Sequence, residues 1–352
     1  MNAIVRNDTG AAEVRFTLDG REVSARAGEN LLEVARREGI AIPHLCYHPG
    51  LEAAGNCRAC VVEIDGERVL APSCCRAATA GMKVHTASER ARKSQQLVLE
   101  LLRSDLPEAA YTRDNEVDRW AERLGVGRPR FAPREQPAAD LSHPAIAVRL
   151  DACIQCTRCL RACRDEQVND VIGLAWRGAR TAIVFDMDDA MGASTCVACG
   201  ECVQACPTGA LAPARDAALA APDKSGDSLC PYCGVGCQLT YHVRDGRIAY
   251  VEGRDGPANR GRLCVKGRYG FDYAHHPHRL TKPLIRRPDV PKRADDAMDP
   301  ERVLEVFREA SWDEALALAG GKLKALRDAH GPQALAGFGS AKGSNEEAYL
   351  FQ

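Results

Sequence analysis

The stretch from Asp151 to Pro213 contains the same cysteine spacing twice. The first copy reads DACIQCTRCLRAC (151–163), and the second reads STCVACGECVQACP (194–207). Both copies have the spacing C-x2-C-x2-C-x3-C, with Cys153, Cys156, Cys159 and Cys163 in the first, and Cys196, Cys199, Cys202 and Cys206 in the second. This spacing is typical of proteins that hold two neighbouring [4Fe–4S] clusters.

In such double-cluster proteins the fourth cysteine of each run binds the cluster of the other run. The predicted ligand sets are therefore Cys153, Cys156, Cys159 with Cys206, and Cys163 with Cys196, Cys199, Cys202. Structural zinc is the alternative for clustered cysteines, but zinc ribbons present pairs of C-x2-C rather than triplets with a trailing cysteine. The sequence thus predicts a double [4Fe–4S] ferredoxin domain over residues 146–213.

Composition limits the class of protein. The 352 residues include 17 cysteines, and a chain of this length contains roughly two or three domains. The first 16 residues, MNAIVRNDTGAAEVRF, contain neither an apolar signal core nor a twin-arginine motif. We therefore expect a cytoplasmic protein whose reduced thiols bind metal rather than form disulfides. No apolar run has the length of a membrane span, and a net charge of −1 gives no basis for nucleic-acid binding.

Residues 1–87 are predicted to form a β-grasp [2Fe–2S] domain. Residues 14–18 and 23–25 alternate apolar and polar side chains around Asp19-Gly20, which predicts a hairpin. The segment GENLLEVARREG (28–39) places apolar residues at helical spacing and ends on Gly39, a residue suited to the C′ position. A hairpin, a helix and then a cysteine loop is the order expected of a β-grasp ferredoxin.

The cysteine loop contains Cys46, Cys57, Cys60 and Cys74, spaced C-x10-C-x2-C-x13-C. Four thiolates suit a [2Fe–2S] cluster, in which each iron takes two. The spacing resembles the N-terminal [2Fe–2S] domain of the large iron–sulfur subunit of respiratory complex I and its relatives, and only this resemblance favours Cys74 over Cys75. His44 and His48 flank Cys46, so a mixed His/Cys cluster is an alternative, although a loop histidine is more often a surface residue or lies behind the ligands.

Residues 88–145 are predicted to form a helical segment and linker. Residues 88–104 form a helix with Ser88 as N-cap and with Leu97, Leu101 and Leu102 on one packing face. Complex I relatives usually continue with one histidine and three cysteines that hold a further [4Fe–4S] cluster. Residues 105–125 contain no cysteine, so we expect that cluster to be absent from this chain. The Pro-rich, charged residues 128–145 then form a linker.

A last cysteine group follows a second linker, at residues 214–227. Its members are Cys230, Cys233, Cys237 and Cys264, spaced C-x2-C-x3-C-x26-C. Residues 238–243 and 247–253 between them are predicted to be two strands joined by a turn at 244–247. The residues alone would allow zinc or an iron–sulfur cluster in this set.

This last group, with Lys266 two residues after the fourth cysteine, closely resembles the [4Fe–4S] domain of molybdenum/tungsten bis-pyranopterin oxidoreductases. Formate dehydrogenases and assimilatory nitrate reductases belong to that family. The resemblance implies a small β-rich [4Fe–4S] domain over residues 228–284, in which Lys266 lies between cluster and pterin and assists electron passage. Lys266 has two alternative roles. It could be an ordinary surface lysine, or a cation that offsets the negative charge of the cluster.

Residues 285–352 resemble the opening of the α/β pterin-binding domain. Ser311 and Glu314 predict a capping box at the start of an amphipathic helix, and residues 333–340 (QALAGFGS) predict a buried strand. Ser344 and Glu347 predict a second capping box, whose helix stops at Gln352. We expect the domain to continue, since a domain does not normally end two turns into an apolar helix. In the resembled family the molybdenum ligand lies beyond this point, so no catalytic residue is assigned.

The order of these domains resembles that of cytoplasmic NAD-dependent molybdenum formate dehydrogenases, and the fold class expected is multidomain α+β. The resemblance implies oxidation of formate to carbon dioxide at a Mo or W bis-pyranopterin guanine dinucleotide. It also implies one [2Fe–2S] and three [4Fe–4S] clusters, and partner subunits that bind flavin and NAD or carry small Fe–S domains. Electrons would pass from pterin by Lys266 and the Cys230 cluster to the double-cluster domain, with the [2Fe–2S] domain on this route, on a side branch or at a dimer contact.

The chain has no G-x-G-x-x-G motif, so NAD is expected to bind elsewhere. Three other functions stay open from the sequence. One is a non-catalytic relay subunit of a complex-I-like or hydrogenase assembly, and another is a different bis-pterin enzyme such as assimilatory nitrate reductase. The third is a scaffold whose cysteines bind structural zinc.

Overall fold

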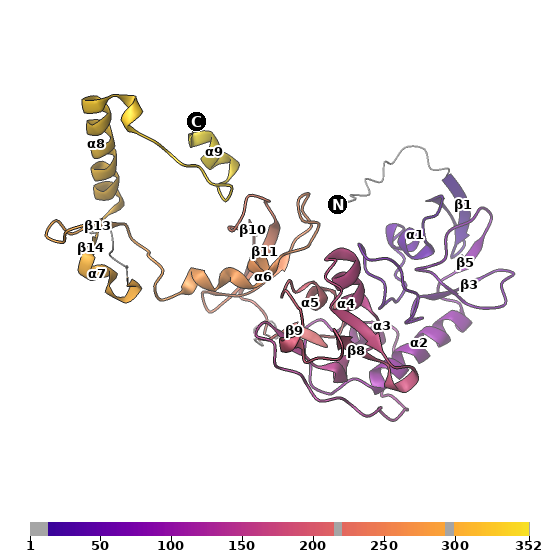
Figure 1. Ribbon diagram of the computed structural model, residues 1–352. Helices are drawn as coiled ribbons and strands as arrows, with labels where there is room; N and C mark the ends of the chain where they lie inside the picture. Colours follow the sequence, from indigo (N-terminus) through magenta and orange to yellow (C-terminus); the bar gives the residue numbers. More distant parts are fainter. Residues whose placement is uncertain (1–12, 215–219, 293–298, 352) are drawn as a thin grey trace. The chain divides into compact units, whose positions relative to one another are not determined.

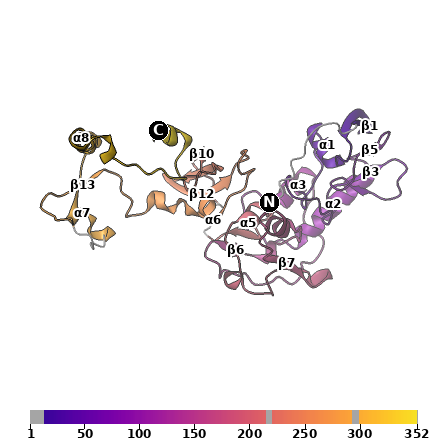
Figure 2. The same cartoon turned by 45° about the horizontal axis from the view of Figure 1, so that its top comes forward.

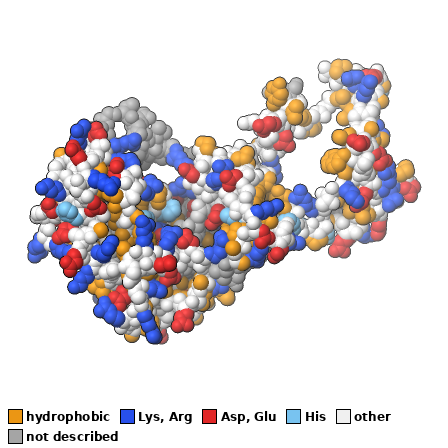
Figure 3. Space-filling model, turned by 180° about the vertical axis from the view of Figure 1, so that it is seen from behind, with side chains coloured by type: hydrophobic (Ala, Val, Ile, Leu, Met, Phe, Trp, Pro, Cys, Tyr) orange, Lys and Arg blue, Asp and Glu red, His pale blue; other side chains and the backbone are white. Residues whose placement is uncertain are grey.

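The computed structural model describes residues 13–214, 220–292 and 299–351. The chain divides into two compact units, drawn in two orientations in Figures 1 and 2. The first unit contains the described residues up to Asp223 together with Arg262–Val265, and the second contains Lys224–Gly261 and the described residues from Lys266 onward. Acidic and basic side chains are interspersed on the face shown in Figure 3.

A five-stranded mixed sheet forms the N-terminal part of the first unit (Figure 1). Its order is β2-β1-β5-β3-β4, and β1 and β5 are the parallel pair. The strands are β1 (Glu13–Leu18), β2 (Arg21–Arg26), β3 (Val61–Ile64), β4 (Ala71–Pro72) and β5 (Lys83–His85). The predicted hairpin is confirmed: Asp19 and Gly20 both have positive φ, at 48° and 80°, as a type I′ turn requires.

The predicted first helix is α1 (Leu31–Arg37), and it packs on this sheet. Its N-cap is Asn30, whose side chain accepts a hydrogen bond from the amide of Glu33 at 2.9 Å. Leu31 and Val34 are fully buried in one core with Leu18 of β1. The same core contains Cys60 and Cys74 of the cysteine loop.

The second predicted helix is α2 (Glu89–Ser104), and Ser88 caps it by accepting from the amide of Ala91 at 3.2 Å. The predicted packing face is wrong for Leu97 and Leu101, which are 41% and 45% exposed. The helix docks instead through Ala91, Gln95 and Leu99, which lie one turn apart on a neighbouring face. A further helix, α3 (Glu116–Arg123), packs against α2.

The double-cluster segment consists of short elements. They are β6 (Ile146–Val148), α4 (Arg158–Arg161), β7 (Ile172–Ala175), β8 (Ala182–Phe185), α5 (Glu201–Ala205) and β9 (Leu211–Pro213). β6 pairs antiparallel with β9, so the two ends of the segment lie side by side. β7 and β8 form a hairpin. Elements this short leave most of the segment as loops around the cysteines.

The second unit begins with a three-stranded antiparallel sheet of β10 (Lys224–Leu229), β11 (Gln238–Arg244) and β12 (Arg247–Gly253). β11 and β12 confirm the predicted strands and their turn. β10, however, occupies residues 224–227, which the sequence assigns to a linker. Its six residues, KSGDSL, are polar or exposed throughout, so this edge strand has no apolar alternation to reveal it. Residues 215–219 of that linker lie outside the described residues.

Farther along come α6 (Val265–Tyr269), β13 (Leu284–Arg286), α7 (Val303–Val306), β14 (Phe307–Glu309), α8 (Trp312–His330) and α9 (Asn345–Phe351). Ser311 caps α8, but the Glu314 carboxylate bonds Arg308 and so does not complete the predicted box. Ser344 and Glu347 do form a reciprocal box at α9. Gln352, where the sequence ends α9, lies outside the described residues.

The predicted buried strand at residues 333–340 is wrong. Pro332–Ala334 forms a 3₁₀ turn, and Phe338 in the following extended stretch is 95% exposed. Within the described part of the chain no strand pairs with this stretch, and an apolar run without a sheet to join has no reason to become a strand. Among the described residues, no helix is both long and apolar enough to cross a membrane.

Candidate iron–sulfur centres

The two cysteine runs of the double-cluster segment follow the same backbone path. Gln155 and Ala198 occupy equivalent positions, and each has a positive φ, at 55° and 53°. The amide of Gln155 donates to Sγ of Cys153 at 3.4 Å, and the amide of Ala198 donates to Sγ of Cys196 at 3.3 Å. An N–H donor directed at sulfur favours the thiolate, which is the form that binds iron.

The eight cysteines of this segment line two separate cavities. One cavity is lined by Cys153, Cys156, Cys159 and Cys206. The other is lined by Cys163, Cys196, Cys199 and Cys202. The structure thus brings the cysteines together in the two groups that the spacing predicts, with the fourth cysteine exchanged. The remaining walls are largely apolar, with Leu150 and Ile183 in the first and Ile172 and Met191 in the second.

Burial sets the acidity of these thiols. Loss of solvation raises the pKa of Cys153 to about 11 and that of Cys156 to about 12, and it raises the pKa of Cys159 and Cys202 well above the ordinary value. Thiols with a raised pKa stay protonated at neutral pH unless a soft metal cation binds the sulfur and displaces the proton. Four soft donors around an apolar cavity therefore fit a [4Fe–4S] cluster, whose electron-transfer chemistry the protein would tune through burial and hydrogen bonds.

The cysteines predicted for the [2Fe–2S] cluster also lie together. The amide of Cys46 donates to Sγ of Cys57 at 3.4 Å. Hydrogen bonds from Cys57 and Cys74 lower the pKa of the Cys46 thiol, and a hydrogen bond from Cys74 lowers that of Cys60. All four predicted side chains are therefore linked by contacts between their sulfurs, and this donor set fits a [2Fe–2S] cluster.

The side chains that the sequence leaves as alternatives lie around this group. Sγ of Cys75 is 3.6 Å from Sγ of Cys74, and Cys75 is exposed. Nδ1 of His44 is 2.8 Å from the carbonyl oxygen of Ile42, and its ring centroid is 5.6 Å from that of Trp120. His48 is partly buried, and loss of solvation lowers its pKa.

No three His, Cys, Asp or Glu side chains of the described residues converge on a point that a single metal ion could occupy. In a [4Fe–4S] cluster each cysteine binds a different iron atom, and in a [2Fe–2S] cluster each iron takes two cysteines, so neither cluster requires three of these side chains at one ion.

The fourth predicted cysteine set is divided between the two units. Cys230, Cys233 and Cys237 lie in the loop between β10 and β11, where the amide of Cys230 donates to the carbonyl of Cys237 at 2.9 Å. Cys264 belongs with the first unit, and the amide of its neighbour Leu263 donates to Oε1 of Glu201 on α5 at 3.1 Å. This ligand set stays a prediction.

The role of Lys266 also stays a prediction. It lies on α6, with Nζ 5.9 Å from the ring centroid of Tyr232 in the β10–β11 loop. The Tyr232 hydroxyl donates in turn to the carbonyl of Gly270. These contacts fix the Lys266 side chain beside the loop that carries three of the four predicted cysteines.

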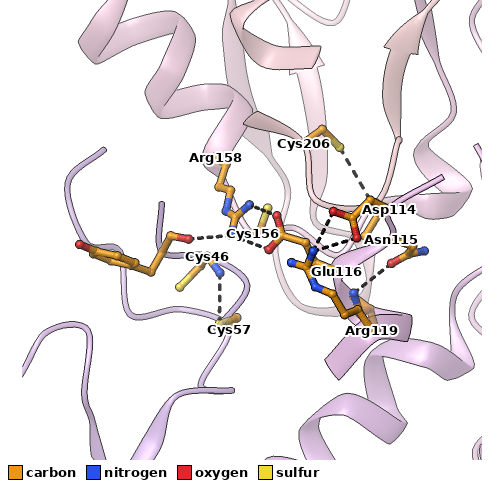
Figure 4. Close-up of polar contacts among 12 residues, drawn as sticks. Cys46, Cys57, Asp114, Asn115, Glu116, Arg119, Cys156, Arg158 and Cys206 are labelled. Carbon is orange, nitrogen blue, oxygen red and sulfur yellow. Dashed lines mark hydrogen bonds and ion pairs between the residues drawn. The ribbon is translucent and has the colours of Figure 1, made fainter. Parts of the chain in front are cut away.

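Sequence reasoning missed two buried arginines on α4. Arg158 and Arg161 are 2% and 5% exposed, although both lie within the first cysteine run. The Arg158 guanidinium makes a two-bond ion pair with Glu116, at 2.7 and 2.9 Å, and donates to the carbonyl of Tyr47 at 2.6 Å (Figure 4). The only signal in the sequence is the i, i+3 spacing of two arginines among the cysteines.

Arg161 connects two of the predicted ligand sets. Its Nη2 donates to the carbonyl oxygen of Cys46 at 2.6 Å and to that of Cys156 at 3.2 Å. Nearby, Nδ2 of Asn56 donates to the carbonyl of Gln155 at 3.3 Å. Within the first unit, the [2Fe–2S] loop and the first [4Fe–4S] loop therefore lie in direct contact.

Four stretches of the chain match known domain families. Residues 11–89 match the 2Fe-2S iron-sulfur cluster binding domain, and residues 152–210 match the 4Fe-4S dicluster domain. Residues 223–276 match the molybdopterin oxidoreductase Fe4S4 domain, and residues 279–352 match the molybdopterin oxidoreductase domain.

Curated relatives align with nearly the whole chain. Probable oxidoreductase YjgC of Bacillus subtilis is 30% identical over 97% of this chain and 38% of its own length. The NADPH-Fe(3+) oxidoreductase subunit alpha of Geobacter sulfurreducens is 31% identical over 96% of this chain and 38% of its own length. A Staphylococcus aureus protein named "Putative formate dehydrogenase" is 28% identical over 96% of this chain and 37% of its own length. This chain thus spans well under half the length of these relatives.

A solved structure is also similar. A chain of an NAD+-reducing [NiFe]-hydrogenase in the H2-reduced state aligns with a TM-score of 0.53 and 29% identity, over 57% of this chain and 87% of that chain. The matches to the 2Fe-2S and 4Fe-4S dicluster domains agree with the three cysteine groups that the described residues bring together. The chain thus contains stretches of the 2Fe-2S, 4Fe-4S dicluster and molybdopterin oxidoreductase Fe4S4 domain families, followed by a stretch of the molybdopterin oxidoreductase domain family.

Proposed function

We propose that this chain is the electron-transferring iron–sulfur part of a cytoplasmic molybdenum- or tungsten-dependent formate dehydrogenase. It would accept electrons from formate oxidation and pass them to a partner subunit that binds flavin and NAD. The observation that carries the relay is the sorting of eight cysteines into two apolar cavities of four. Formate as substrate is supported by the similarity to the Staphylococcus aureus protein and by the order of the domains.

The proposed cluster ligands are the four sets assigned from the sequence. They are Cys46, Cys57, Cys60 and Cys74 for [2Fe–2S], and Cys153, Cys156, Cys159 and Cys206, then Cys163, Cys196, Cys199 and Cys202, and finally Cys230, Cys233, Cys237 and Cys264 for three [4Fe–4S] clusters. Lys266 is proposed to assist electron passage toward the pterin. The chain's own contribution is to bury the thiols and hold them at fixed positions.

Metal analysis of the anaerobically purified chain tests the relay. One [2Fe–2S] and three [4Fe–4S] clusters require roughly fourteen iron and fourteen acid-labile sulfide per chain. Roughly two to four zinc ions without visible absorption would instead identify a zinc-stapled scaffold.

The substrate is tested on the complete protein. Formate added anaerobically should bleach the visible absorption of the clusters, and nitrate should not reoxidise them. Reoxidation by nitrate at turnover rates would identify a nitrate reductase and contradict formate oxidation as the function.

The similarity to the hydrogenase chain favours a second candidate, a relay without a catalytic site of its own. A pure relay would be reduced by NADH or NADPH through its partner and would not respond to formate in the complete protein. The two functions are therefore separated by the choice of reductant in one experiment.

A further inference from the structure

Arg161 is a buried cation that contacts two different predicted ligand loops. Its guanidinium donates to the carbonyls of Cys46 and Cys156, which belong to the [2Fe–2S] set and to the first [4Fe–4S] set. A third bond goes to the carbonyl of Glu52. The side chain is held by backbone carbonyls from both sides, so its position is fixed relative to both groups of thiols.

Arg158, three residues earlier on α4, is buried in a different way. Its charge is balanced by the two-bond ion pair with Glu116. Among the described residues, Arg161 forms no ion pair with a carboxylate. Asp165, four residues later in the chain, instead accepts a hydrogen bond from Arg164 at 2.6 Å. One positive charge on α4 is thus balanced by a carboxylate, and the other is not.

An unbalanced cation in a protein interior is unfavourable by several kcal/mol unless negative charge lies close to it. Iron–sulfur clusters bound by four thiolates are anionic, and each gains one further negative charge when it accepts one electron. A fixed cation beside such a cluster stabilises the reduced form more than the oxidised form, because the attraction grows with the charge on the cluster.

We propose that Arg161 is a shared counter-cation for the [2Fe–2S] cluster of the Cys46 set and the [4Fe–4S] cluster of the Cys153 set, and that it raises the reduction potential of both. Arg161 is a positioning residue that contacts the carbonyls of two ligand residues and acts through charge. This inference rests on the proposed relay function, because it requires that both cluster sites be loaded.

The test is a redox titration of the complete chain with dithionite, followed by electron paramagnetic resonance. Arg161→Gln should shift both midpoint potentials to lower values while the signals of the other clusters stay in place. At the wild-type midpoint of each affected cluster, the ratio of reduced to oxidised cluster should fall roughly tenfold, which corresponds to about 59 mV for a one-electron couple. The matched control is Arg164→Gln, since Arg164 lies on the same segment but is exposed and paired with Asp165.

Arg161→Lys separates charge from a structural role and serves if the glutamine variant fails to fold. Lysine keeps the positive charge but cannot reproduce the planar, three-bond arrangement. Potentials near the wild-type values in this variant support the counter-cation role. Potentials that fall in Arg161→Lys as far as in Arg161→Gln, or that stay unchanged in Arg161→Gln with both clusters present, overturn the inference. If the wild-type chain shows no [2Fe–2S] or [4Fe–4S] signals, the relay function itself is wrong, and that outcome is distinct.

Discussion

Cys206 shows at the scale of one residue how the double-cluster segment is connected. It follows Cys202 by four residues, yet it lines the cavity of the first cysteine run rather than that of the second. We expect Cys206→Ser to remove the same cluster as Cys153→Ser, because both substitutions take a ligand from one site. Iron analysis should find a loss of about four iron atoms in either variant, with the same spectral component missing.

Cys163→Ser is the comparison for that experiment. It should remove the other cluster, whose remaining ligands come from the second run. If Cys206→Ser and Cys196→Ser instead lost one common spectral component, each run would bind its own cluster and the exchange of the fourth cysteines would be wrong.

The ion pair between Arg158 and Glu116 gives a second prediction for single residues. The Arg158 side chain is 3% exposed, so Glu116→Gln would leave a buried guanidinium without its counter-charge. We expect the free energy of unfolding, measured by anaerobic urea titration, to fall by about 3 kcal/mol. The exposed pair of Asp114 with Arg119 provides the control, and Asp114→Asn should change it by less than about 1 kcal/mol. Equal effects in the two variants would show that the Arg158 pair is not buried in solution.

The grouping of the eight cysteines was predictable from their spacing. Cys206 lines the cavity of the first run and Cys163 that of the second, as the repeated spacing predicts, whereas their role as cluster ligands stays a prediction. The bonds of Arg158 and Arg161 to the carbonyls of residues 46, 47 and 52 could not be predicted, because they join residues 109 to 115 positions apart. The local sequence around such an arginine does not show whether its side chain is buried. Its burial depends on how the two cysteine loops pack against each other.

At the scale of elements, α2 depends on one buried polar side chain. Gln95 is 2% exposed, and its Nε2 donates to the carbonyls of Val61 on β3, at 2.9 Å, and of Thr86, at 3.1 Å. Gln95→Ala would leave both buried carbonyls without their donor. We expect the free energy of unfolding of the chain to fall by about 1–3 kcal/mol in urea titration.

Arg92→Ala on the exposed face of α2 is the matched control, and it should change stability by less than about 0.5 kcal/mol. A Gln95→Ala variant as stable as this control would mean that water replaces the lost donor. The helix would then be held by Leu99 and its apolar neighbours alone.

Elements were predictable from sequence where capping and periodicity act locally, as for the hairpin at Asp19 and the helix that begins after Ser88. Other elements depend on which strands are available to pair with them. β10 exists because its backbone pairs with β11, although its side chains are polar. Residues 333–340 are apolar but have no strand to pair with among the described residues, so periodicity alone gave the wrong element.

At the scale of the whole molecule, metal content should control the order of unfolding. The N-terminal sheet has a continuous core that includes Leu18, Leu31 and Val84, whereas the double-cluster segment is built of elements of three to five residues. In such segments metal binding supplies folding free energy that a small core cannot. After chelation of iron, we expect limited trypsin digestion to cut first between residues 150 and 210.

The N-terminal sheet should resist the same digestion, and mass spectrometry of the fragments would show it. A protease-resistant segment 150–210 after complete iron removal would show that the eight cysteines are not needed to keep this part folded. Cleavage throughout residues 13–104 at the same rate would show that the [2Fe–2S] site stabilises the sheet equally.

The pairing of β6 with β9 has a consequence for how this chain can be rearranged. Because these strands lie side by side, the double-cluster segment starts and finishes at one point and could be spliced into a surface loop of another protein without stretching either end. The surface around α4 is harder to transfer. Arg158 and Arg161 donate to the carbonyls of Tyr47 and Cys46, and these residues lie outside the segment. A host protein would therefore have to present backbone carbonyl oxygens on that side. Without them, both guanidinium groups would lose these hydrogen-bond acceptors.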